Sequence, residues 1–332
     1  MTVADGILCI IGAGVIAYTV LGGADFGGGV WDLFAHGPRR DQQRDVISST
    51  MGPVWEANHV WLVFVLIGLF SGFPTAFGHL TRMLAVPLAI ALLGIVLRGS
   101  AFVFRQYGAA APGLAGQPAV RGTATWGRIF AIASTVTPVM LGLCAGAVAT
   151  GRLSGPFPPV AGALAIAFCA YLAAVFLCQE ARSRGLPRLA DDFRRRGVAA
   201  AVVAGALAVL AVPVLAVDAP DLAARLTDRA AAFVVASAAG GLGSIVALLR
   251  RRFVLARVAA AVAVASVVAG WGVATYPVIV PPGLTVAQAA APAQTLPVTL
   301  GVLIAGFAVT VPSLVLLFHI FSQPTPGTPR TS

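Results

Sequence analysis

Residues 7–31 read ILCIIGAGVIAYTVLGGADFGGGVW, and this stretch decides the fold. Its one charged side chain is Asp25. About 20 consecutive apolar residues in a helix are enough to cross the hydrocarbon core of a bilayer. A surface helix of a soluble protein would instead carry a polar face. The stretch therefore predicts a membrane-spanning helix.

The rest of the chain repeats this pattern. Of the 332 residues, 58% are hydrophobic and only 10% are charged. Soluble domains carry about 25% charged residues, so the composition excludes a soluble enzyme, a disordered chain and a secreted disulfide scaffold. Lipid favours helices, which satisfy every backbone group within their own segment. The nine predicted spans are residues 7–31, 55–73, 80–104, 129–150, 160–179, 198–217, 230–249, 253–276 and 296–321.

These spans predict an all-α polytopic membrane protein with one transmembrane domain over residues 1–322. The proline-rich residues 323–332 are expected to be a disordered tail. A short helix is expected between Pro38 and Pro53, with Pro53 breaking it before the second span. Asp41 and Arg44 are spaced for an ion pair in that helix. Residues 277–295 are expected to form an irregular loop on the outer face.

The arginines indicate the orientation. The chain has 22 basic residues and a net charge of +10. Seventeen arginines belong to one set of connections and four to the opposite set, with Arg98 inside a span. Cytoplasmic connections are enriched in arginine, so the N-terminus is expected outside and the C-terminus in the cytoplasm. Because the arginines lie in short connections without interleaved aromatic residues, nucleic-acid binding is not expected.

Five polar side chains lie inside the spans at similar depths: Asp25, Glu56, Asn58, His59 and Arg98. Charged residues inside a membrane are costly and indicate function. One interpretation is a proton path from the cytoplasm through Asp25, Glu56 and His59, because carboxylates and imidazole exchange protons. The other is a buried ion pair of Arg98 with Asp25 or Glu56 that locks helices together. The sequence leaves both open.

The segment Gly22-Gly23-Ala24-Asp25-Phe26-Gly27-Gly28-Gly29 surrounds the first of these charges. Glycine in a membrane helix permits close approach of a neighbouring helix. It also permits a local break whose carbonyl groups line a polar pocket. A phosphate-binding loop is not expected, because no strand precedes the segment.

Metal or haem ligation by this chain is not expected. The chain has four histidines, and only His59 and His319 could share one side of the membrane. One such pair would hold at most one haem.

Three motifs resemble subunit II of the cytochrome bd-type quinol oxidases. They are the glycine segment at 22–29, GPVWEANHVWL at 52–62 and LRGSAFVFR at 97–105. The second is the most specific, with the form GPxW-[DE]-x-N-x-VWL. The resemblance is dense over residues 10–110 and weaker afterwards.

The resemblance implies two four-helix bundles plus a peripheral helix, in a bacterial plasma membrane. It implies a haem-bearing subunit I as partner and contact with the quinone pool. That subunit would carry haem b, either together with haem d or alone. This chain would supply a cytoplasmic proton path and ligate no haem, and it could hold a quinone as a structural lipid. The quinone type and any small accessory subunit stay open.

Residue by residue, Glu56 takes the place of the family's usual Asp, and Asp25 matches the second acid of an acidic motif in the first helix. Four structural residues match directly, namely Trp55, Asn58, Trp61 and Arg98. The departures are Gly22 for the first acid of that motif, Ala24 for Phe, Ala57 for Gly, and His59 where Gln or Glu is commoner. They indicate a divergent branch.

Two other classes of function stay open from the residues alone. A secondary transporter would couple an ion at Asp25, Glu56 and Arg98 beside a broken helix. Inverted repeats would support that class, and none is visible in the sequence. The other class is a purely structural assembly partner.

Overall fold

The computed structural model describes residues 2–110 and 123–321. The elements in chain order are α1 (Val3–Leu33), α2 (Arg40–Gly72), α3 (Pro74–Met83), α4 (Ala85–Ala110), α5 (Thr123–Thr150), α6 (Phe157–Ser183), α7 (Pro187–Asp218), α8 (Pro220–Thr227), α9 (Ala231–Leu249), α10 (Phe253–Thr275), β1 (Val278–Val280), β2 (Leu284–Thr285), α11 (Val286–Ala289) and α12 (Thr295–Phe321). Nine helices of the described residues are long and apolar enough to span a membrane. The predicted all-α fold with nine spans is confirmed.

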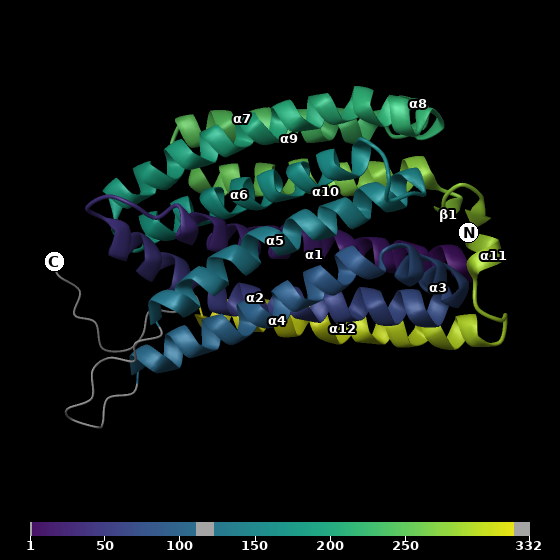
Figure 1. Ribbon diagram of the computed structural model, residues 1–332, viewed down its shortest axis with the longest axis horizontal. Helices are drawn as coiled ribbons and strands as arrows, with labels where there is room; N and C mark the ends of the chain where they lie inside the picture. Colours follow the sequence, from purple (N-terminus) through teal and green to yellow (C-terminus); the bar gives the residue numbers. More distant parts are fainter. Residues whose placement is uncertain (1, 111–122, 322–332) are drawn as a thin grey trace.

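The spanning helices form two groups of four with one helix at the side (Figure 1). The first group is α1, α2, α4 and α5, and the second is α6, α7, α9 and α10. Helix α1 is central, because it packs against α2 and α5 in its own group and against α6 and α10 in the other. Helix α12 packs against α1 and α2. This arrangement matches the two four-helix bundles plus a peripheral helix implied by the sequence resemblance.

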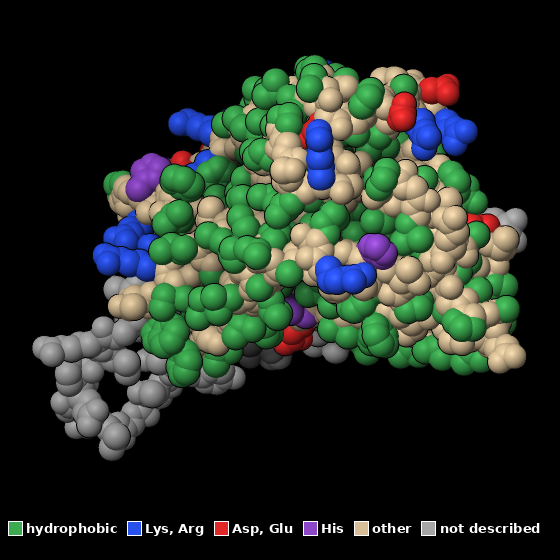
Figure 2. All heavy atoms as spheres, turned by 45° about the vertical axis from the view of Figure 1, so that its right-hand side comes forward, with side chains coloured by type: hydrophobic (Ala, Val, Ile, Leu, Met, Phe, Trp, Pro, Cys, Tyr) green, Lys and Arg blue, Asp and Glu red, His purple; other side chains and the backbone are tan. Residues whose placement is uncertain are grey.

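The outer surface is apolar. Hydrophobic side chains cover most of the face seen in Figure 2, and charged side chains are few on it. Large side chains such as Phe70, Val86 and Val209 are more than 60% exposed. In water such a surface would promote aggregation, so it is suited to lipid or to another membrane subunit.

The predicted break at Pro53 is wrong, since α2 is one continuous helix from Arg40 to Gly72. Proline inside a helix costs about 3 kcal/mol, and packing on the second group offsets this cost. Val46 and Ile47 are buried in the core of that group. Arg184 donates hydrogen bonds to the hydroxyl groups of Ser49 at 2.6 Å and Thr50 at 3.1 Å.

Other expectations also need correction. Arg44 does not pair with Asp41; its Nε lies 3.7 Å from Oδ1 of Asp32. The third span begins at Ala85, because residues 74–83 form the separate helix α3. The connection at 277–295 is more regular than expected, with a hairpin of β1 and β2 followed by α11. The predicted tail at 323–332 lies outside the described residues.

Candidate functional site

The glycine segment remains helical and packs closely against its neighbours. A Cβ atom at Gly27 would overlap the carbonyl oxygen of Cys169 in α6, and one at Gly29 would overlap the side chain of Ser134 in α5. At Gly23 it would lie 2.6 Å from Leu172. Of the two predicted uses of these glycines, the structure shows close helix approach and no break in α1.

This close packing holds Asp25 in the interior, where it forms an ion pair with Arg98 of α4. The guanidinium donates from Nη1 to Oδ2 of Asp25 at 2.8 Å and from Nη2 to Oδ1 at 2.5 Å. Nη2 also lies 3.1 Å from the backbone oxygen of Asp25. The side chains of Asp25 and Arg98 are 0% and 2% exposed. The sequence left Asp25 and Glu56 open as partners of Arg98, and the structure selects Asp25.

The remaining groups around Arg98 complete its surroundings. Its Nε donates to Oγ of Ser134 in α5 at 2.8 Å. Its guanidinium carbon lies 5.1 Å from the ring centre of Phe26 and 5.0 Å from that of Phe130, within the range of a cation–π contact. A buried pair is tolerated only when its hydrogen-bonding groups are satisfied. The ion pair thus joins α1, α4 and α5.

Asn58 connects α2 to the same pair. Its Nδ2 lies 3.4 Å from Oδ2 of Asp25, and it is 1% exposed. Its Oδ1 faces Gly22, where a Cβ would lie 2.8 Å away. Gly22, which stands where the resemblance places a further acid, therefore leaves room for the Asn58 amide. The four helices of the first group therefore meet at the ion pair of Asp25 and Arg98.

Glu56 and His59 lie away from this pair. Glu56 is exposed on the surface of α2, and His59 is half-buried. Nδ1 of His59 lies 2.8 Å from the backbone oxygen of Trp55, one turn earlier. The polar residues that the sequence placed at one depth are therefore divided between a buried ion pair and an exposed acid with its neighbouring imidazole.

The two tryptophans of the second motif have different surroundings. The ring of Trp55 packs 4.8 Å from that of His59 and 6.3 Å from that of Phe102 in α4. Trp61 is 5% exposed and its ring lies 5.4 Å from that of Phe307, which attaches α12 to α2. Among the described residues, the indole nitrogens of both tryptophans and Oδ1 of Asn58 are buried without a hydrogen-bond partner.

Sequence reasoning missed Ser134 and Asp32. A single serine in an apolar helix gives no signal that it faces an arginine. Asp32 is 0% exposed at the end of α1 and close to Arg44. The sequence could have indicated Asp32, because it is a carboxylate directly after the predicted first span.

The histidines whose side chains are described lie at different places along the first group of helices. His36 precedes α2, His59 lies well inside it, and His79 belongs to α3 beyond the far end of α2. Ligation of a haem by two histidines would need two of them at one depth on facing helices. No group of three metal-ligating side chains occurs in the described parts of the chain. The side chain of His319 lies outside the described residues.

Comparison with known proteins adds an independent observation. The sequence matches the family of cytochrome bd terminal oxidase subunit II over residues 4–321. The chain belongs to this family. Cytochrome bd ubiquinol oxidase subunit 2 of Bacillus subtilis (strain 168) is 34% identical over 90 residues, which are 27% of this chain and 26% of that protein. The match therefore spans about a quarter of that relative's length.

The fold of the subunit II family is also found in a solved structure. A chain in the structure of bd oxidase from Geobacillus thermodenitrificans superposes with a TM-score of 0.75. The superposition covers 97% of this chain and 99% of that one, at 22% sequence identity. The bundle arrangement described above is thus the fold of that chain, although most of the side chains differ.

Proposed function

We propose that this chain is subunit II of a quinol:oxygen oxidoreductase in a bacterial plasma membrane. Family membership and the name of the B. subtilis relative support this proposal. Its partner would be a haem-bearing subunit I, carrying haem b with or without haem d, which takes electrons from the quinone pool. In this proposal the partner would ligate the haems and reduce oxygen. The arginine distribution supports an N-terminus outside and a C-terminus in the cytoplasm.

The exposure of Glu56 is the observation that supports a role for this chain in proton transfer. It is the third residue of the span Val54–Gly72 and lies about 10 Å from the middle of that span, at 1.5 Å per residue. This is inside a hydrocarbon core of about 30 Å. A carboxyl group facing lipid there is costly. The face of α2 around Glu56 is therefore suited to contact with subunit I and water rather than with acyl chains.

Glu56 and His59 share this face because residues three apart are neighbours on a helix. Carboxylate and imidazole can pass a proton in sequence. We therefore place the membrane part of the proton path at Glu56 and His59 on this surface of α2, with water reaching Glu56 from the cytoplasmic end of the span. Arg98 donates hydrogen bonds to both carboxylate oxygens of the buried Asp25. A positioning role for Asp25 and Arg98 follows, while proton transfer by Asp25 itself stays a prediction.

The test compares Glu56→Gln with Asp45→Asn in the purified oxidase complex. Asp45 is an exposed acid of the same helix, eleven residues earlier and so on nearly the same face, but outside the span. Oxygen consumption with excess quinol should fall at least about tenfold in Glu56→Gln and stay unchanged in Asp45→Asn. Glu56→Asp should recover most of the rate.

The haem spectrum of the co-purified partner reports assembly separately from turnover. Normal assembly with normal oxygen consumption in Glu56→Gln would show that the proton path is wrongly placed. Loss of the partner in that variant would instead assign Glu56 to assembly. The transporter alternative is less well supported, because it relied on a broken α1 and this helix is continuous.

A further inference from the structure

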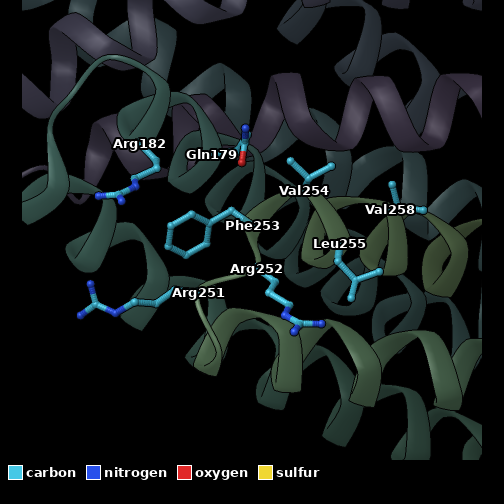
Figure 3. A pocket seen from close by; sticks show the side chains of 8 residues that line it. All are labelled: Gln179, Arg182, Arg251, Arg252, Phe253, Val254, Leu255 and Val258. Atoms are coloured by element: carbon cyan, nitrogen blue, oxygen red, sulfur yellow. The ribbon is translucent and has the colours of Figure 1, made fainter.

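A groove of about 560 Å³ lies where the end of α6 meets the turn between α9 and α10 (Figure 3). Its volume falls within the range of ligand pockets. Three arginines contribute to its lining: Arg182 of α6, and Arg251 and Arg252 of the turn. The apolar part of the lining belongs to the first turns of α10 and includes Val254, Leu255 and Val258. These three side chains are more than half exposed.

The backbone of this turn is unusual. Helix α9 ends with the N–H of Arg252 bonded to the oxygen of Ala247 at 2.8 Å, and that of Arg251 to the oxygen of Leu248 at 3.1 Å. This is the Schellman pattern, which places a residue in the left-handed region and normally uses glycine there. Arg251 occupies that position with φ 58°.

The turn between α6 and α7 provides an internal comparison. It has the same pattern, with the N–H of Leu186 bonded to the oxygen of Ala181 at 3.0 Å. Its left-handed residue is Gly185, with φ 71°. The same local geometry thus carries glycine at one turn and arginine at the turn beside the groove. An arginine in a conformation that disfavours side chains suggests a use for its charge.

The groove has an excess of positive charge. Arg251 lies 3.1 Å from Asp191, which also pairs with Arg194 at 3.2 Å. In the part of the chain that the structure describes, no ion pair neutralises Arg182 or Arg252. Figure 3 shows Arg252 extending to the side where Leu255 lies, whereas Arg182 and Arg251 point the other way, with the ring of Phe253 between them in this view.

The position of the groove relative to the membrane selects its ligand. The span of α10 begins at Phe253, so Arg252 lies at the boundary and the valines and leucine lie just inside it. Cations above an apolar wall complement a phosphate group above an acyl chain. We propose that the groove binds one anionic glycerophospholipid, with its phosphate at Arg252 and an acyl chain along Val254, Leu255 and Val258, while Arg182 and Arg251 add positive charge at the edge of the groove.

The test uses the purified oxidase complex in detergent and counts bound lipid by native mass spectrometry. Phosphatidylglycerol and phosphatidylcholine with identical acyl chains are titrated separately. The double variant Arg182→Gln/Arg252→Gln is compared with Arg195→Gln/Arg250→Gln, which removes the same charge from exposed arginines outside the groove lining. Each arginine near a headgroup should contribute about fivefold in affinity, so the double variant should bind phosphatidylglycerol about 25-fold more weakly. The control pair should bind it normally.

Two results would overturn the proposal: equal affinity for the two lipids in the unmodified complex, or equal loss in the double variant and its control. Displacement of phosphatidylglycerol by millimolar inorganic phosphate would also contradict it, because a lipid is held by its chain as well. Arg251→Gly decides the matter if the double variant does not assemble. Glycine suits the left-handed turn, so this variant should keep its thermal stability and bind phosphatidylglycerol about fivefold more weakly. Unchanged affinity in that variant would refute a role for the arginine-rich turn.

Discussion

Replacing Arg98 with methionine tests how the first bundle is held together. The change removes both hydrogen bonds from Arg98 to the Asp25 carboxylate and leaves only Asn58, at 3.4 Å, beside a fully buried acid. Removing one partner of a buried ion pair costs about 3–5 kcal/mol, because the other charge stays uncompensated. Arg98→Met should therefore lower the free energy of unfolding by about that amount. Asp25→Asn should cost a similar amount, since it leaves the buried guanidinium without its acid.

The double variant Asp25→Asn/Arg98→Met leaves neither charge. It should cost only about 2 kcal/mol, from the hydrogen bonds lost to Ser134 and the backbone. The assay is unfolding of the purified complex by SDS in mixed micelles, followed by tryptophan fluorescence. Arg82→Met is the control, because Arg82 is exposed in α3 and bonds only to the backbone of its own helix; it should change stability by less than about 0.5 kcal/mol. A double variant that costs the sum of the two single variants would refute the reasoning.

Two further substitutions address helix packing with the same assay. Gly27→Ala should destabilise the protein by about 1–3 kcal/mol, because the new methyl group overlaps the Cys169 carbonyl and α1 must move from α6. Gly12→Ala should be neutral or stabilise by about 0.5–1 kcal/mol, because no atom outside the adjacent backbone of its own helix would lie within 4 Å of the new methyl group. Equal effects of the two changes would contradict the close approach of α1 and α6. Trp61→Ala should cost about 3–5 kcal/mol, because it empties the contact between α2 and α12. Val63→Ala on the outer face of the same helix is its control, and a similar loss there would show that the α12 contact is not responsible.

The number and class of the helices could be predicted because the length of an apolar run is a local property of the sequence. Boundaries that depend on distant contacts could not. Nothing near Pro53 in the sequence shows that Val46 and Ile47 are buried against the second bundle. Similarly, the hairpin and α11 lie in a stretch whose composition resembles that of an irregular loop.

For the candidate site, the depth of each polar residue in the membrane was predictable. The direction in which its side chain points was only partly predictable. Asp25 and Arg98 were identified because charges are rare in spans, and the structure joins them. Glu56 and Asn58 are two residues apart, which places them about 200° apart around a helix. They could not both face Arg98, and this periodicity could have separated Glu56 from the pair. Whether Glu56 or Asn58 faces the interior depends on the space beside Gly22. That space arises from the packing of α1 against α2 and is not visible in the local sequence.

The ion pair between α1 and α4 also has a consequence for synthesis of the chain. Asp25 and Arg98 are separated by 73 residues. At about 5–20 residues per second, the ribosome adds the arginine roughly 4–15 s after the aspartate. During that interval the first helix must enter the membrane with its acid unpaired, at an insertion cost of about 2.5–3.5 kcal/mol at the membrane centre. The apolar side chains of this helix offset the cost, since its most apolar 18 residues have a mean hydropathy of 2.1. Apolar residues of α1 far from Asp25 are therefore needed for insertion before they contribute to the finished bundle.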